Sequence, residues 1–169
     1  MVKRWWKTVL FLAIVAIAGL GLFFAYLQHH GFSARAKPNP LEEAFALAAR
    51  KFVLPSSVKD KKNPLLDSPV YIAQARDHYA DHCAVCHDFD GSGDTKISKG
   101  MYPPAPDMRA ERTQSLTDGE LFYIIKEGIR FSGMPGFGGS NDENWKLVQF
   151  IRHLPNLSDE ELTLMKEKK

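Results

Sequence analysis

The first apolar feature of the chain is an uncharged run of twenty residues, from Thr8 to Leu27. At about 1.5 Å per residue, a helix of this length spans roughly 30 Å, which is the thickness of a bilayer core. Trp5 and Trp6 precede the run and Tyr26 lies near its end, where spanning helices carry interfacial aromatic residues. The pattern predicts an N-terminal transmembrane helix within residues 1–30.

The charges around this run predict its orientation. Lys3, Arg4 and Lys7 precede it, and basic flanks stay on the cytoplasmic side. We therefore expect a single-pass protein of the inner, cytoplasmic membrane, with the remaining residues in a bacterial periplasm or an equivalent space. The alternative is a cleaved signal peptide, because Ala34-Arg35-Ala36 has the small-x-small form of a cleavage site. The apolar run is longer than the usual signal core of about 7–15 residues, which favours a retained anchor.

Residues 31–67 have the pattern of a linker. Prolines interrupt it at Pro38, Pro40, Pro55 and Pro64. Between them, residues 41–53 are rich in Ala, Leu and Glu and predict a short helix. This helix could pack on the following domain or lie near the membrane, and the pattern leaves both open.

Helical signals continue through residues 68–157. Ser68-Pro69 is a capping hydroxyl followed by proline at the first helical position, which predicts a helix running to His82. Its expected buried side comprises Val70, Ile72, Ala73, Tyr79 and Ala80.

Two more helices are predicted after a loop-rich middle segment. Thr117 and Glu120 form a capping box that opens a helix, which Gly128 can terminate. Asn141 or Asp142 can cap the next helix, which Pro155 ends. That helix carries the apolar side chains expected to cover the core, at Trp145, Leu147, Val148, Phe150 and Ile151. Residues 158–169 predict a polar tail with a short solvated helix.

The charge distribution excludes one class of function. The segment 31–67 has seven basic and four acidic residues, whereas 68–157 has nine basic and twelve acidic ones. A nucleic-acid-binding domain needs a basic patch on its folded part, and here the basic surplus precedes the domain. We therefore expect no nucleic-acid partner.

The candidate chemistry lies in Cys83-Ala84-Val85-Cys86-His87, which contains both cysteines of the chain. A Cys-x-x-Cys-His run is the signal for covalent attachment of a c-type haem. Two thiols three residues apart lie on one face of a helical turn, where they can add to the two vinyl groups of a porphyrin. His87 then offers a nitrogen to the iron as the proximal ligand. The sequence predicts one covalent haem c.

Three other interpretations of this motif are weaker. A thioredoxin-like redox pair would need a βαβ context that the sequence does not suggest. A structural disulfide leaves the adjacent histidine unexplained. A zinc site could use His78, His82 and the motif itself, but structural zinc usually draws on two separated ligand pairs.

The next two segments are loops. Residues 88–94 begin like a calcium-binding loop, but position twelve is Lys99 rather than the required glutamate, so we predict a glycine-rich turn. Residues 102–107 contain three prolines and should form a stiff loop. Such a loop can hold a carbonyl against the second ring nitrogen of His87, although a rigid surface turn is equally compatible with its composition.

Met134 is the predicted sixth ligand of the iron. It lies forty-seven residues after His87, so a helix and two loops can carry the chain around the ring. Gly133 and Gly136 would let the backbone approach the porphyrin, and Pro135 stiffens the loop. Met101 is too close to His87 in sequence, Met108 follows the proline loop on the expected proximal side, and Met165 lies in the polar tail. His153 is the best alternative ligand.

Together these segments resemble a monohaem class I cytochrome c. The resemblance covers residues 68–157 and rests on the helix into the Cys-x-x-Cys-His motif, the proline loop, Gly133-Met134-Pro135-Gly136 and the last aromatic-bearing helix. It implies an all-α fold around one haem iron with His87 and Met134 as axial ligands. Pro104 of the proline loop is included among the residues expected to contact the haem.

The resemblance implies a one-electron carrier of a respiratory or periplasmic chain, rather than an enzyme. Its redox partners would dock transiently, and the N-terminal helix would bind the membrane. Two alternatives remain open. One is a haem subunit of a larger membrane oxidoreductase complex, and the other is an open-site haem sensor or peroxidase-like protein.

Overall fold

The computed structural model describes residues 2–31, 33–130 and 132–167. Within these ranges the regular structure is entirely helical, which confirms the predicted all-α class. The chain divides into two compact units, with the boundary between Ala36 and Lys37.

The first unit contains a single helix, α1 (Val2–His30). Its stretch Trp5–His30 is 26 residues long and is the one described helix that is long and apolar enough to cross a membrane. From Trp5 to Tyr26 its large apolar side chains are exposed, as the lipid-facing residues of a spanning helix would be.

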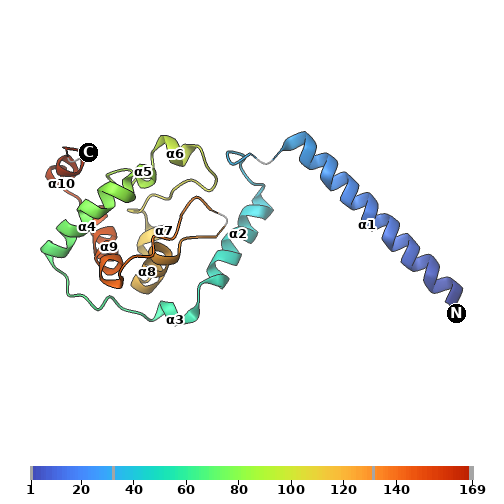
Figure 1. Ribbon diagram of the computed structural model, residues 1–169, viewed down its shortest axis with the longest axis horizontal. Helices are drawn as coiled ribbons and strands as arrows, with labels where there is room; N and C mark the ends of the chain where they lie inside the picture. Colours follow the sequence, from blue (N-terminus) through green and yellow to red (C-terminus); the bar gives the residue numbers. More distant parts are fainter. Residues whose placement is uncertain (1, 32, 131, 168–169) are drawn as a thin grey trace. The chain divides into compact units, whose positions relative to one another are not determined.

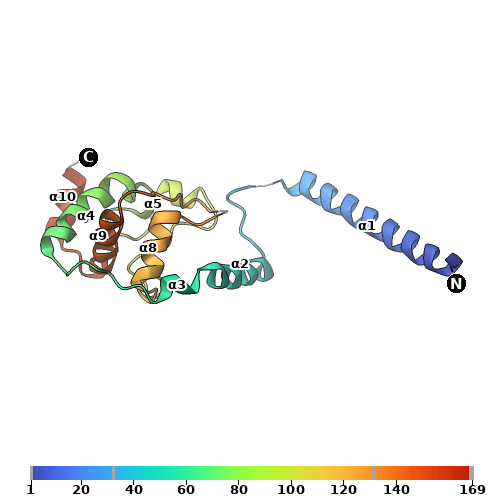
Figure 2. The same ribbon diagram turned by 60° about the horizontal axis from the view of Figure 1, so that its bottom comes forward.

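The core of the second unit is built on three helices, α4 (Pro69–His82), α8 (Asp118–Glu127) and α9 (Asn141–His153). In Figures 1 and 2, α9 lies beside both α4 and α8. The ring centroids of Tyr79 on α4 and Phe150 on α9 are 5.0 Å apart, and those of Phe122 on α8 and Trp145 on α9 are 4.1 Å apart. These aromatic contacts join three helices that are distant in sequence into one apolar core.

The predicted burial of these helices is largely confirmed. All five apolar residues expected on α9 are buried, and so are Tyr79 and Ala80 on α4. The prediction for Val70 is wrong, because its side chain is 61% exposed in the first turn of α4. Ala75 takes a buried position instead, where a small side chain allows close packing.

The helix ends follow the predicted chemistry with two differences. Thr117 and Glu120 form the expected capping box, and Gly128 ends α8 with a φ of 71°. However, Ser68 accepts no capping hydrogen bond. The cap of α9 is Ser140, which forms a second capping box with Glu143, one residue before the predicted cap. The Ser-x-x-Glu spacing carried this signal, and the neighbouring Asn141 and Asp142 obscured it.

The packed domain begins earlier than residue 68. After α2 (Pro40–Val53), the short helix α3 (Ser56–Lys59) buries Val58 against α8. A Cβ on Gly119 would collide with the Val58 carbonyl oxygen, so glycine allows this close approach. The amide of Asn63 also donates to the Trp145 carbonyl at 2.9 Å. The second half of the predicted linker is therefore part of the domain.

The C-terminal tail also differs from the prediction. It forms the expected helix, α10 (Asp159–Glu167), but this helix packs on α4 rather than being fully solvated. Met165 is 1% exposed and belongs to the core, whereas Leu164 is 50% exposed. Met165 and the partly buried Leu162 together dock the helix, and two apolar positions in a short polar segment form too short a pattern to predict this.

Candidate haem site

The two cysteines lie where α4 ends. Cys83 is the C-cap of α4 and the N-cap of α5 (Ala84–His87), a single turn that contains the rest of the motif. The amides of Cys86 and His87 both donate to the Cys83 carbonyl, at 3.1 and 2.9 Å. Both thiols are free of any disulfide. Burial, followed by the neighbouring Cys86, raises the pKa of Cys83 to about 12, so this thiol is protonated near neutral pH.

His87, the last residue of this turn, is buried, with 6% of its surface exposed. Its Nδ1 atom lies 3.4 Å from the carbonyl oxygen of Pro106. A carbonyl only accepts, so Nδ1 must carry the proton, and Nε2 keeps its lone pair in the neutral ring. Burial lowers the pKa of His87, which the Pro106 carbonyl opposes to a smaller extent. Burial thus favours the neutral ring, and the Pro106 carbonyl fixes its tautomer, which leaves one nitrogen free in the form that binds iron.

The proline loop that carries Pro106 is attached to the segment after the motif. The amide of Ala105 donates to the Ser98 hydroxyl at 2.9 Å, and the amide of Met108 donates to the Gly91 carbonyl at 2.8 Å. Gly93 has a φ of 72°, and a Cβ there would collide with the carbonyl oxygen of Ala105. The glycine-rich turn therefore lies directly against the proline loop and helps to position the Pro106 carbonyl.

The same turn is also held to the motif itself. The amide of Gly93 donates to the His87 carbonyl at 2.8 Å, and the Thr95 hydroxyl donates to the Cys86 carbonyl at 3.1 Å. The fully buried Tyr79 donates from its hydroxyl to the Asp88 carbonyl at 2.9 Å. Asp88 has a positive φ of 61°, which lets the chain reverse directly after His87.

The loop that carries Met134 is attached to the end of α8. The amides of Phe137 and Gly138 donate to the carbonyls of Ile125 and Lys126, at 3.1 and 3.0 Å. Within the loop, the amide of Ile129 donates to the Met134 carbonyl at 3.1 Å. The Met134 side chain is half-buried. These bonds hold the loop in a defined shape, as a ligand-bearing loop requires.

The glycines of this loop have neighbours that the sequence did not predict. A Cβ on Gly133 would collide with the sulfur of Met101, so a second thioether lies against the Met134 loop. Gly136 lies against the Glu127 carbonyl at the end of α8. In both cases glycine makes room for the protein's own atoms. Met101 is near His87 in sequence, yet the fold places its sulfur against the Met134 loop.

The remaining candidates are occupied elsewhere. The Nε2 atom of His153 lies 3.0 Å from each carboxylate oxygen of Glu161 on α10. Met108 and Met165 are buried in the core. Pro104 is exposed, and Pro106 rather than Pro104 supplies the carbonyl that faces His87. In the described part of the chain, no three His, Cys, Asp or Glu residues are grouped to hold a metal ion, so the zinc and calcium alternatives gain no support.

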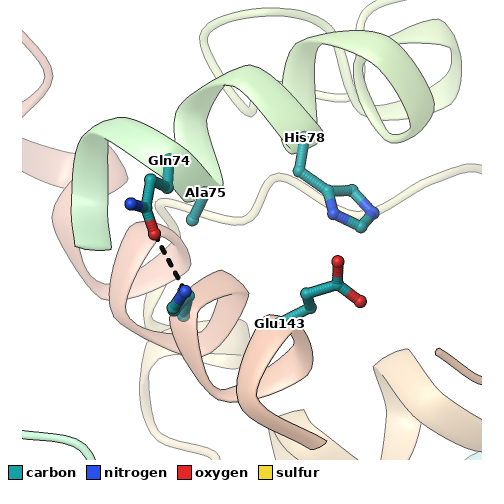
Figure 3. Close-up of a pocket in the computed structure, with 5 residues that line it drawn as sticks. Gln74, Ala75, His78 and Glu143 are labelled. Atoms are coloured by element: carbon teal, nitrogen blue, oxygen red, sulfur yellow. Dashed lines mark hydrogen bonds between the residues drawn. The ribbon is translucent and has the colours of Figure 1, made fainter. Parts of the chain in front are cut away.

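A small polar cavity of about 190 Å³ lies between α4 and α9, separate from the motif (Figure 3). Figure 3 shows His78 and Glu143 on opposite sides of it, and Lys146 donates to Gln74 at 2.8 Å. Burial, followed by the proximity of His82, lowers the pKa of His78. None of the predicted site residues lines this cavity.

The residues present fit a covalently attached haem. The thiols of Cys83 and Cys86 are three positions apart and form no disulfide. The adjacent imidazole of His87 is buried and has one nitrogen in contact with a carbonyl. The thioether of Met134 lies on a loop that backbone hydrogen bonds hold in place. When bound, such a haem supplies an iron that exchanges one electron between its ferric and ferrous states.

Comparison with known proteins agrees with this chemistry. Residues 71–151 match the family model of cytochrome c oxidase, cbb3-type, subunit III. A search of curated proteins found no match to the chain. The match begins in α4 and ends in α9, so it contains the motif, the proline loop and the Met134 loop. The second unit of this chain therefore contains a domain similar to cbb3-type oxidase subunit III, and this similarity supports a class I c-type cytochrome with haem-based electron transfer.

Proposed function

We propose that this protein is a membrane-tethered carrier of single electrons. One haem c would be attached through Cys83 and Cys86, with His87 and Met134 as its axial ligands. The observation that carries the proposal is the contact between Nδ1 of buried His87 and the Pro106 carbonyl. This contact selects one tautomer and leaves Nε2 of the same ring available as an iron ligand.

The surrounding residues suit electron transfer rather than substrate chemistry. Met134 is a neutral ligand, and a neutral ligand in a site of low polarity favours the ferrous state and raises the reduction potential. The hydrogen bonds at both loops limit movement of the two ligand-bearing segments. A carrier with two protein ligands needs no open position on the iron. Donor and acceptor proteins would dock transiently on the domain.

The location of the carrier follows from α1. Its apolar stretch of 26 residues suits a retained anchor, and the basic residues before it would stay in the cytoplasm. The cytochrome domain would then lie on the periplasmic side of the inner membrane.

A second candidate function is a fixed haem subunit of a larger oxidoreductase complex. The description of the matching family, an oxidase subunit, favours it. The two candidates differ in whether the protein leaves its partners. Mild detergent extraction followed by size-exclusion chromatography would separate them, because a shuttle elutes alone and a subunit elutes with its complex.

Covalent attachment tests the proposal most directly. Mass spectrometry of the denatured protein should show a haem-sized mass increase, which the Cys83→Ala, Cys86→Ala double variant loses. Absorption spectra of the reduced protein should not change with carbon monoxide, because His87 and Met134 would occupy both axial positions. Haem that extracts freely into acidified organic solvent would contradict covalent attachment. A clear carbon monoxide spectrum would favour the open-site sensor or peroxidase-like alternative.

A further inference from the structure

The helix α2 presents an exposed apolar face that the domain does not cover. Leu41 is 83% exposed and Phe45 is 77% exposed. With Ala48, also exposed, they are spaced at i, i+4 and i+7, so they form one stripe along the helix. None of these three side chains is buried against the domain. Two large, adjacent and exposed apolar side chains on a helix indicate an interaction surface.

The far side of α2 carries an acidic residue, Glu43. Glu43 is two positions from both Leu41 and Phe45 and so projects from the far side of the helix. Asn39 caps α2 by accepting from the Glu42 amide at 2.9 Å, and Pro40 occupies its first position. The helix therefore has a defined start of its own and does not need a packing partner to set its first turn.

Chain length keeps α2 close to the end of α1. Only residues 31–39 separate His30 from Pro40, and an extended chain of that length reaches about 35 Å at most. A turn closed by the Ala36 amide and the Ser33 carbonyl, 3.1 Å apart, shortens this reach. If α1 spans a bilayer, α2 is held near the bilayer surface at a high effective concentration.

The charges beside α2 suit an anionic surface. Arg35 and Lys37 precede the helix, and Lys59, Lys61 and Lys62 follow it, all exposed. An amphipathic helix with basic residues nearby binds at the interface of a bilayer that contains anionic lipids. A redox partner or a second copy of the chain could also cover an apolar stripe, but neither is kept in place by the covalent tether.

We propose that α2 lies on the membrane surface, with Leu41 and Phe45 inserted among the lipid headgroups. The proposal rests on the proposed retention of α1 as an anchor. Only Leu54 and Pro55 separate α2 from α3, which is packed on α8. An α2 bound to lipid therefore holds the cytochrome domain within a few residues of the bilayer and limits how it turns.

The test uses the full-length haem protein in vesicles. Its own cysteines are consumed as thioethers, so a single added cysteine can carry an environment-sensitive fluorophore. The labelled positions are Leu41→Cys and Phe45→Cys on the apolar stripe and Glu43→Cys as the matched control on the far side. Quenching by aqueous iodide is compared with quenching by lipids that carry a shallow nitroxide, in zwitterionic vesicles with and without phosphatidylglycerol.

Positions 41 and 45 should be protected from iodide severalfold relative to position 43 and should be quenched by the nitroxide lipid. This difference should increase with phosphatidylglycerol. Iodide quenching at 41 and 45 equal to that at 43 would overturn the proposal. Protection from both quenchers would also overturn it, because it would mean that protein covers the stripe.

Two controls separate this inference from the proposed function. Gly19→Cys on α1, where an added side chain meets nothing, reports whether the anchor is inserted. If position 19 is open to iodide, the anchor itself fails, and the surface position of α2 fails with it. If position 19 is protected but 41 and 45 are not, only the inference on α2 fails. The parent protein should take up no label, and each variant should keep the parent haem spectrum.

Discussion

His87 and Met134 are supported in different ways at the scale of single residues. His87 is buried, and its ring and carbonyl contact two loops, through Pro106 and Gly93. Met134 is half-buried on a loop whose backbone bonds reach α8, and the Asn144 side chain on α9 donates to the Gly138 carbonyl of the same loop at 2.6 Å. His87 is thus the more buried of the two residues, and the identity of the sixth ligand is the point that needs an experiment.

The first prediction distinguishes the two methionines at this loop. Met134→Ala should abolish the weak near-infrared sulfur-to-iron band of the oxidised protein and lower the reduction potential, because a thioether ligand stabilises ferrous iron. Met101→Ala is the matched control, since its sulfur lies against Gly133 on the same loop. It should keep the band. A band that survives in Met134→Ala and disappears in Met101→Ala would assign the ligand to Met101.

A second prediction at this scale concerns acid stability. The side chain of Arg109 donates to both Asp107 oxygens and to Asp90, each at 2.9–3.0 Å. The hydrogen bonds from Arg109 lower the pKa of Asp107 in the folded protein. A lowered folded-state pKa stabilises the fold above the unfolded value of about 3.9, and this contribution is lost as the pH falls through the folded value.

Arg109→Gln should therefore reduce the free energy of unfolding at pH 7 and have a smaller effect near pH 3. Because these side chains are more than a third exposed, we expect a loss of about 1 kcal/mol or less at pH 7. Urea unfolding at the two pH values measures the difference. Arg112→Gln, which removes the same charge from an exposed position, is the control. An equal loss at both pH values would exclude ionised Asp107 as the cause.

At the scale of elements, α10 extends the domain beyond the family match. The match ends at residue 151, whereas α10 covers Asp159–Glu167 and packs on α4. Its attachment depends on buried Met165 and on the pair between His153 and Glu161. Because α4 leads directly into the cysteine motif, α10 supports the helix that positions Cys83.

Truncating the buried side chain of α10 should therefore destabilise the domain. Replacing a buried Met by Ala lowers the free energy of unfolding by about 2–5 kcal/mol. We expect a loss of about 2 kcal/mol for Met165→Ala, because a terminal helix can detach locally. Leu164→Ala is the matched control, since that neighbour is 50% exposed and should cost about 0.5 kcal/mol or less. Equal effects of the two variants in urea unfolding would show that α10 is not docked in solution.

At the scale of the whole molecule, the two compact units differ in where their apolar side chains lie. α1 exposes apolar side chains along its length, whereas the cytochrome domain buries its own around Tyr79 and Phe150. An exposed apolar helix of 26 residues is stable in lipid and unfavourable in water.

We predict that the apolar run 8–27 stays on the mature protein as a membrane anchor. Membrane fractions should keep the haem protein through a high-salt wash, because salt screens charges but does not weaken apolar insertion. Detergent should release it with residues 8–27 still present, as N-terminal sequencing would show. A mature N-terminus at Lys37 would mean that cleavage after Ala36 removes the helix, and the protein would then appear in the soluble fraction.

Local patterns were sufficient for the main helices and for locating the cysteine motif within one helical turn. The Thr117–Glu120 capping box, Pro69 and Gly128 act within one turn of chain, so their structural effect can be read without knowing the fold. The spacing of Cys83, Cys86 and His87 likewise lies within a single helical turn. The long apolar run of α1 required only its length and lack of charge.

The sequence by itself thus determined the helical class, the anchor candidate, the cysteine motif and the prediction of Met134. Only the tertiary structure decided which proline carbonyl faces His87, that Met101 returns to the Met134 loop, and that residues 58–66 and α10 belong to the domain. Each of these depends on contacts between segments far apart in the chain. Their energies come from burial and close packing, which the order of residues along a single segment does not encode.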